Sequence, residues 1–158
     1  EILDQLNTEL IHALKQNKKE GNDGMDIALC VIDFYAGTLK FAGAYRPLWM
    51  LRDKELSEVK GSKFPIGGHQ IHDERHFKTH DLAIKKGDRF YIFTDGFADQ
   101  FGGENGKKMT TKKLKEFFRN THSDSIIHQG NRLSNFFETW KGDNEQLDDV
   151  CVIGFEVS

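Results

Sequence analysis

The sequence predicts an α+β domain in which a layered β-sandwich is flanked by helices. An amphipathic helix begins the 158-residue chain, several antiparallel-looking strands follow it, and two helices and a last strand complete it. Strands and helices do not alternate one for one, which argues against a doubly wound parallel sheet. The length suffices for one domain with a substantial core, so we treat residues 1–158 as a single domain.

The first helix and the first hairpin have the strongest local patterns. Leucines recur at helical spacing near the start of the chain, which predicts an amphipathic helix over residues 2–15. Residues 25–34 are too apolar and β-branched for a surface helix, and residues 38–44 follow a turn at Ala36-Gly37. These two segments therefore predict a β-hairpin.

The rest of the chain predicts further strands and two helices. The strands are expected at residues 48–51, 56–59, 76–84, 89–94 and 150–157, the last of them buried. Residues 64–68 predict a loop and residues 85–88 a turn. Apolar residues at helical spacing predict two helices within residues 114–140, with Asp124 as N-cap of the second and Gly142 at its end.

Charge and composition exclude several classes of partner. The net charge is −3, from 22 basic and 25 acidic residues, so no strong field attracts nucleic acid or anionic lipid. No apolar stretch approaches the ~20 residues that span a bilayer, so we expect no direct membrane contact. Cys30 and Cys151 stand in apolar runs, as free buried thiols do, which fits a reducing cytoplasmic compartment.

Acidic residues stand at the ends of the two most apolar late strands. Asp95 follows one strand, and Asp148 and Asp149 precede the other. If these strands are antiparallel neighbours, the carboxylates converge, and clustered carboxylates need a cation such as Mg²⁺ or Mn²⁺. Asp-Gly is also a common turn signal, and an Asp pair before a strand often caps a loop, so each motif alone is weak.

Together these motifs resemble a known family. Residues 88–99, which contain Asp95-Gly96, and residues 148–154 resemble the paired acidic motifs of the PPM protein phosphatases, in the bacterial branch typified by SpoIIE and RsbU. Residues 41–48 and 64–68 resemble the "AGH-PP" and "P-(L/I)-G" segments of that branch, in the same order. The resemblance extends from residue 2 to residue 157.

The resemblance implies a signalling phosphatase for phosphoserine or phosphothreonine. Two Mn²⁺ or Mg²⁺ ions would hold a water that attacks the phosphoryl group, so no side chain is the nucleophile. Asp95 and Asp148 would be ligands of the same ion, Asp149 would orient it or bind through water, and Gly96 belongs to the motif. Asp26 stands where relatives often carry Thr and is a doubtful candidate to face the metal site, because a lone Asp on a strand is more often a surface residue.

One departure from the family weighs against catalysis by these residues alone. The family has an N-terminal Asp followed by Gly-His-Gly that bridges both metals, and only Gly68-His69, in the wrong order, contains a Gly-His here. We therefore expect a domain truncated at its N-terminus, with at most one weak metal site.

The alternative is a non-catalytic, partner-binding pseudophosphatase module. A third interpretation, Asp95 as a phospho-acceptor, lacks the expected Asp-x-Asp pattern.

The resemblance also implies partners. The substrate would be a phosphorylated protein, with an anti-sigma-factor antagonist as one class, and a sensor domain would lie upstream. An uncovered apolar stripe on the first helix would favour a homodimer. Zinc at His69 and His72 is disfavoured because no acidic or Cys partners stand at metal spacing. Trp49 and Trp140 are expected in the core or at an interface.

Overall fold

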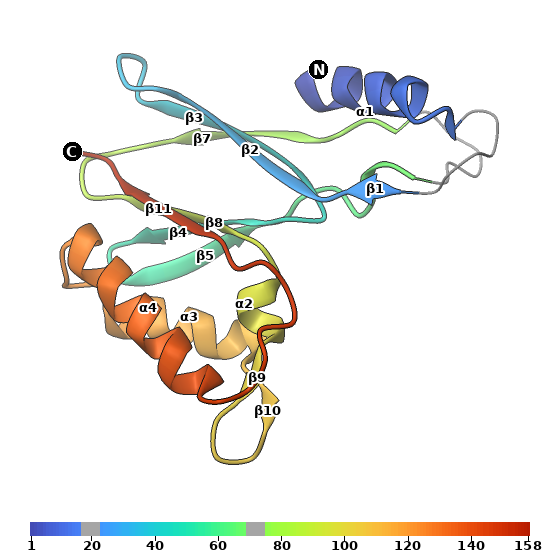
Figure 1. Ribbon diagram of the computed structural model, residues 1–158. Helices are drawn as coiled ribbons and strands as arrows, with labels where there is room; N and C mark the ends of the chain where they lie inside the picture. The colour runs from blue at the N-terminus through green and yellow to red at the C-terminus, as the bar shows by residue number, and fades with distance from the viewer. Residues whose placement is uncertain (17–22, 69–74) are drawn as a thin grey trace. The chain divides into compact units, whose positions relative to one another are not determined.

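The computed structural model describes residues 1–16, 23–68 and 75–158 (Figure 1). The chain divides into two compact units. The first comprises Glu1–Leu48 and Val59–Ile84, and the second comprises Trp49–Glu58 and Lys85–Ser158. Each unit has its own sheet and its own hydrophobic cluster.

The first unit contains the predicted hairpin. Strands β2 (Ile27–Asp33) and β3 (Thr38–Ala44) pair antiparallel, and β7 (Thr79–Ala83) pairs with the other side of β3. The turn between β2 and β3 needs Gly37, whose φ of 63° lies in the left-handed region. The structure thus confirms the β-hairpin.

Two short strands correct the predicted boundaries in this unit. Strand β1 (Gly24–Met25) pairs with β6 (Ile66–Gly67), so the apolar run from Met25 is interrupted at Asp26. The segment expected as a loop at residues 64–68 therefore contains a strand. Neither segment has the length or alternation that identifies a strand from sequence.

Helix α1 (Ile2–Ala13) packs on this unit through its apolar stripe, as predicted. Leu3 is 2% exposed and lies in a cluster with Ala44, Ile66 and Phe77. Buried Asn7 accepts a hydrogen bond from the Gly67 N–H at 2.8 Å. A polar side chain thus also fixes the helix against β6.

The second unit is built on a sheet with strand order β11-β8-β4-β5. These strands are β4 (Leu48–Arg52), β5 (Glu55–Val59), β8 (Arg89–Phe93) and β11 (Val152–Glu156). Central β8 is nearly all buried and pairs antiparallel with both β4 and β11. The expected successive strands at residues 76–84 and 89–94 exist, but β7 and β8 belong to different sheets.

Strand β11 contradicts the prediction of a buried final strand. Its residues are half-buried or exposed, and Cys151 just before it is exposed as well. Among the described strands β11 pairs with β8 alone, so it lies at a sheet edge. Its apolar sequence therefore does not reflect burial on two sides.

Cys30 is half-buried, and burial raises the pKa of its thiol to about 11.

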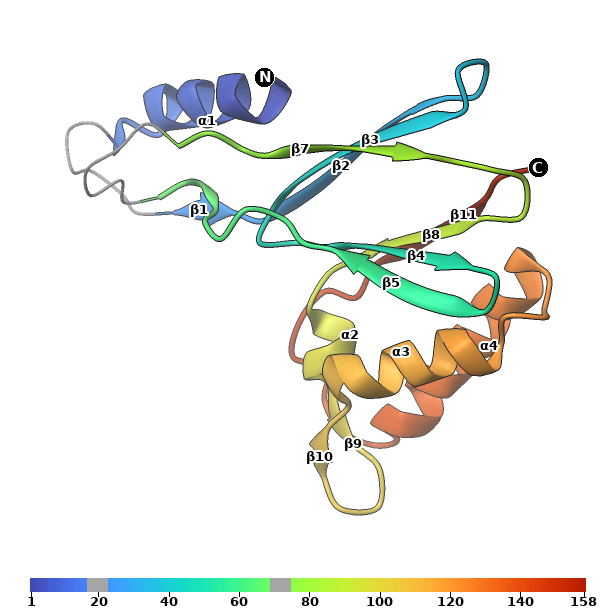
Figure 2. The same cartoon turned by 180° about the vertical axis from the view of Figure 1, so that it is seen from behind.

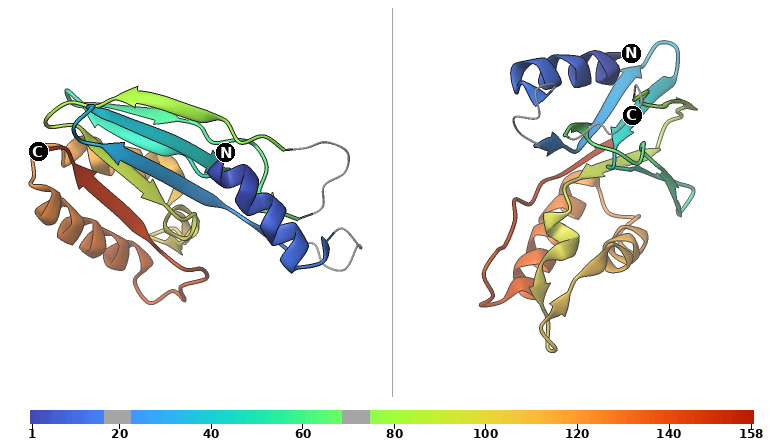
Figure 3. Two further views of the ribbon diagram at one scale, coloured as in Figure 1. Left: turned by 90° about the horizontal axis from the view of Figure 1, so that it is seen from above. Right: turned by 90° about the vertical axis from the view of Figure 1, so that its right-hand side faces the viewer.

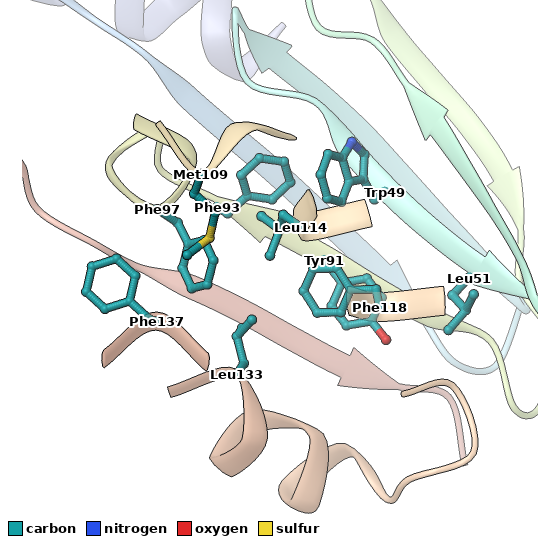
Figure 4. Packing of buried hydrophobic residues seen from close by; sticks show 10 residues of the cluster. All are labelled: Trp49, Leu51, Tyr91, Phe93, Phe97, Met109, Leu114, Phe118, Leu133 and Phe137. Carbon is teal, nitrogen blue, oxygen red and sulfur yellow. The ribbon is translucent and has the colours of Figure 1, made fainter. Parts of the chain in front are cut away.

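Helices α3 (Thr110–Asn120) and α4 (Ile126–Lys141) lie on one face of this second sheet, together with the short helix α2 (Gly96–Asp99) (Figures 2 and 3). Trp49 and Tyr91 from the sheet meet Phe118 of α3 in the core, with the Tyr91 and Phe118 rings stacked at 4.0 Å between centroids (Figure 4). Phe137 is buried, and Phe136 and Trp140 pack against the same cluster. The predicted aromatic core is confirmed.

The ends of α4 test the capping predictions. Ser125, and not Asp124, is the N-cap, and its hydroxyl accepts a hydrogen bond from the His128 N–H at 3.3 Å. Asp124 forms an ion pair with Arg132 at 2.7 Å instead. Gly142 ends the helix with a φ of 53°, as expected. Both Asp and Ser suit an N-cap, so sequence alone does not decide between neighbours.

Within residues 1–16, 23–68 and 75–158, no helix combines the length and apolar character needed to cross a membrane.

Candidate metal centre

The two acidic motifs lie at the same end of the second sheet. Strands β8 and β11 are antiparallel, with Phe93 opposite Val152. Asp95 therefore leaves β8 at the end where the chain from Asp148 and Asp149 enters β11. The sequence prediction required this antiparallel adjacency, and the structure confirms it for the backbone.

Thr94 joins the two motifs directly. Its N–H donates to the Cys151 carbonyl at 3.0 Å, and its Oγ1 accepts from the Cys151 N–H at 2.9 Å. The same hydroxyl donates to the Asp149 carbonyl at 2.9 Å. The residue preceding Asp95 thus holds the backbone on both sides of Val150.

Gly96 brings the start of α2 against the second motif. A Cβ atom at this position would lie 2.5 Å from the carbonyl oxygen of Asp149, a separation that no side chain tolerates. Gly96 is buried, and its backbone conformation does not itself demand glycine. The close approach of the two chain segments is the reason for glycine here.

Gln100 and Gln146 fix the segment that leads into Asp148. Gln100 is 1% exposed, and its Nε2 donates to the Glu145 carbonyl at 2.9 Å. Gln146 Nε2 donates to the Asp148 carbonyl at 3.0 Å, and the Asp149 N–H donates to Asp148 Oδ1 at 2.7 Å. Because these bonds restrain the backbone and one carboxylate, the segment has a defined course although Asp148 and Asp149 are exposed.

The three carboxylates have the donor chemistry that a hard cation prefers, but they are too few to hold two ions. Carboxylate oxygens of Asp95, Asp148 and Asp149 suit Mg²⁺ or Mn²⁺. Among the described residues, no group of three or more His, Cys, Asp or Glu side chains is arranged to hold a metal ion. Asp95 is exposed, and water would complete the coordination of any single ion held here.

Asp26 has a different partner. It lies in the first unit, exposed between β1 and β2, and its Oδ2 accepts a hydrogen bond from Arg46 Nη2 at 2.6 Å. The ion pair agrees with the interpretation of Asp26 as a surface residue. His69 and His72 lie outside the described residues.

Sequence reasoning missed the roles of Thr94 and Gln100. A β-branched hydroxyl residue at the end of the strand predicted at residues 89–94 is a weak signal that could have identified Thr94. Gln100 gave no signal, because its partner is a backbone carbonyl 45 positions away.

A family model described as "Stage II sporulation protein E (SpoIIE)" matches residues 1–158 of the chain. No curated protein sequence matches it.

Solved structures resemble the chain in fold. The SiaA-PP2C domain of Pseudomonas aeruginosa superimposes with a TM-score of 0.76 at 22% identity, over 98% of this chain and 69% of its own. The phosphatase domain of the cell fate determinant SpoIIE from Bacillus subtilis gives 0.64 at 16% identity, over 99% and 71%. The serine/threonine phosphatase PstP/Ppp of Mycobacterium tuberculosis gives 0.63 at 13% identity, over 94% and 66%. These similarities confirm the predicted α+β fold class, and the chain spans about two thirds of the length of each.

Proposed function

The chain belongs to the SpoIIE family, a branch of the PPM phosphatases, and from this premise we propose that it is part of a metal-dependent phosphoserine/phosphothreonine protein phosphatase domain. The observation that supports this most directly is the contact of Thr94 and Gly96 with the Asp149 backbone. It brings together the two acidic motifs, which lie more than fifty residues apart in the sequence. The contact follows from the pairing of β8 with β11, and a shared metal site requires this adjacency of the two motifs.

Asp95 and Asp148 are the proposed ligands of one ion, and Asp149 is the residue that orients that ion or binds it through water. A bound Mn²⁺ or Mg²⁺ would neutralise charge on a phosphoryl group and lower the pKa of water. The protein contributes by fixing the positions of the three aspartates. Thr94 and Gln100 fix the two chain segments, and exposure of the three aspartates leaves room for a phosphorylated side chain.

We infer that the 158 residues by themselves hydrolyse phosphoprotein poorly or not at all. The chain contains no Asp followed by Gly-His-Gly, the motif that bridges two ions in the family. Two carboxylates with water bind Mg²⁺ or Mn²⁺ loosely, so one weak site is the most that these residues provide. The activity belongs to a protein in which a bridging carboxylate is also present.

The test uses the longest natural form of the protein that contains these residues. Mn²⁺-dependent release of phosphate from a phosphoserine peptide should be measured for that form and for its Asp95→Asn variant. Activity that requires Mn²⁺ and is lost in the variant supports the proposal. Absence of Mn²⁺-dependent activity in the unaltered protein, or full activity in Asp95→Asn, contradicts it.

A non-catalytic, partner-binding module is the second candidate. The missing bridging motif favours it, as does the absence of a three-ligand group among the described residues. Such a module binds its regulator equally with Mn²⁺ or with EDTA, and Asp95→Asn leaves binding unchanged. Binding that requires both Mn²⁺ and Asp95 contradicts this candidate and favours the phosphatase.

We propose a phosphorylated regulatory protein as the substrate, with an anti-sigma-factor antagonist as the first class to assay. The Bacillus subtilis relative is described as a cell fate determinant, a regulatory role. Bacterial signal transduction in the cytoplasm, with an upstream sensor domain, completes this proposal. The net charge of −3 gives no general attraction to nucleic acid.

A homodimer through α1 is a further part of the proposal. Ile2 at the start of this helix is 58% exposed and its C-cap Leu14 is 42% exposed, although Leu3 is buried. Sedimentation of the chain and of a double variant, Ile2→Ser with Leu14→Ser, tests it. A dimer that the variant abolishes supports the proposal, and a monomer at all concentrations rejects it.

A further inference from the structure

Where β8 and β11 diverge, the hydroxyl of Thr94 accepts a hydrogen bond that a backbone carbonyl would otherwise accept. Thr94 lies opposite Cys151 in this antiparallel pair, one position beyond Phe93 and Val152. At each hydrogen-bonded pair of a regular antiparallel ladder, the two opposite residues exchange two N–H to carbonyl bonds. Here the Thr94 N–H donates to the Cys151 carbonyl, but the Cys151 N–H donates to Thr94 Oγ1 at 2.9 Å.

Because the Thr94 hydroxyl replaces a carbonyl as acceptor, β8 and β11 can diverge and still remain hydrogen-bonded. The chain leaves the extended conformation at Asp95, whose φ of −74° and ψ of −22° begin α2. A strand end that turns into a helix ordinarily releases its neighbour. The side-chain oxygen keeps the Cys151 N–H satisfied and also donates to the Asp149 carbonyl at 2.9 Å. The Asp149 backbone is therefore held next to the point where the chain passes from β8 into α2.

We propose that Thr94 is a positioning residue that sets the separation between the Asp95 carboxylate and the carboxylates of Asp148 and Asp149, and thereby the affinity for a divalent cation. This inference rests on the proposed function. Loss of a hydrogen bond that orients a metal ligand from outside the ligand set typically lowers metal affinity by about 10–100-fold. Thr94 touches the backbone of the ligand segment and acts only through it.

Two substitutions separate the hydroxyl from the shape of the side chain. Thr94→Val keeps the β-branched volume and removes both hydroxyl bonds, whereas Thr94→Ser keeps the hydroxyl. Tyr91→Phe is the control for stability, because it removes a buried hydrogen bond of 2.8 Å to Gln129 on the same strand β8, away from the aspartates.

The experiment is a Mn²⁺ titration of the 158-residue chain, followed by the electron paramagnetic resonance signal of free Mn²⁺. Thr94→Val should weaken binding roughly tenfold or more, Thr94→Ser should restore most of the affinity, and Tyr91→Phe should leave it unchanged. Amide hydrogen exchange without metal provides the second measurement. The Cys151 N–H should lose protection in Thr94→Val and keep it in Thr94→Ser.

The outcomes distinguish this inference from the proposed function. Equal Mn²⁺ affinity in the unaltered chain and Thr94→Val overturns the inference alone, as does unchanged Cys151 exchange in Thr94→Val. Equal weakening by Thr94→Val and Tyr91→Phe also overturns it, because the effect would then be one of stability. No Mn²⁺ binding by the unaltered chain overturns the inference, whereas the proposed function is decided by Mn²⁺-dependent phosphate release in the longest natural form.

Discussion

The guanidinium of Arg52 donates two hydrogen bonds to the carboxylate of Asp88, from Nε at 2.7 Å and from Nη2 at 2.5 Å. Asp88 is 1% exposed and accepts a third bond from the Lys85 N–H at 2.8 Å. Burial by itself raises the pKa of Asp88, but these hydrogen bonds outweigh it and hold that pKa below its ordinary value. The pair joins β4 to the turn before β8.

Replacement of this carboxylate should destabilise the second unit. Asp88→Asn is expected to lower the free energy of unfolding by about 2 kcal/mol at pH 7, because partly solvated Arg52 loses its charge partner. Since the folded pKa is depressed, the contribution is complete above the unfolded pKa of about 3.9 and is lost as pH falls through the folded pKa. Urea denaturation of both proteins at pH 7, 5 and 3 measures this. A difference that shrinks between pH 7 and 5 contradicts the assignment.

Gly96→Ala should destabilise the chain, because the new Cβ would lie 2.5 Å from the Asp149 carbonyl oxygen. We expect the free energy of unfolding to fall by about 1–3 kcal/mol, the range for overpacking. Gly130→Ala is the matched control. Gly130 lies inside α4 with nothing within 4 Å of its Cβ position, so alanine there should stabilise by about 0.5–1 kcal/mol. Equal effects of the two substitutions in thermal denaturation would show that no close approach exists at Gly96.

Gln100→Leu should loosen the segment before Asp148. It removes the donor to the Glu145 carbonyl, and we expect a loss of about 1–2 kcal/mol in the free energy of unfolding. Hydrogen exchange should accelerate over residues 143–148. Gln5→Leu, on the exposed side of α1, should leave that exchange unchanged. Unaltered exchange in Gln100→Leu would show that other contacts hold the segment.

Asp148 and Asp26 should differ in their effect on metal affinity. Asp148→Asn is expected to weaken Mn²⁺ binding by roughly tenfold or more, since a charged ligand is lost. Asp26→Asn should leave binding unchanged, because Asp26 is engaged with Arg46 at 2.6 Å. Calorimetric titration of both variants measures this. A loss of affinity in Asp26→Asn alone would move the site to the first unit.

Periodicity predicted the helices and most strands because these elements carry their signal locally. The leucines of α1 and the Phe136 and Phe137 region of α4 repeat at helical spacing, and both face a core. The backbone adjacency of the two acidic motifs was also predictable, because only one pairing of two apolar strands had to be assumed. The structure adds the hydroxyl of Thr94, which the pattern of apolar residues does not encode.

Pairing partners and burial could not be predicted in the same way. Strands β7 and β8 are separated by a short turn, yet the first pairs with β3 and the second with β4 and β11. A turn signal reports a change of direction and says nothing about the sheet to which each strand belongs. The apolar run of β11 predicted burial, but burial depends on neighbours, and a sheet edge supplies one neighbour fewer.

The edge position of β11 has a practical consequence for handling the isolated chain. Among the described residues only β8 pairs with it, and Ile153 in its centre is 52% exposed. An apolar strand with free backbone donors and acceptors is a template for intermolecular β-pairing. Concentrated solutions should therefore precipitate slowly into β-rich material. The Ile153→Lys variant should precipitate more slowly, because a charge on an edge strand opposes its pairing with a strand of another molecule.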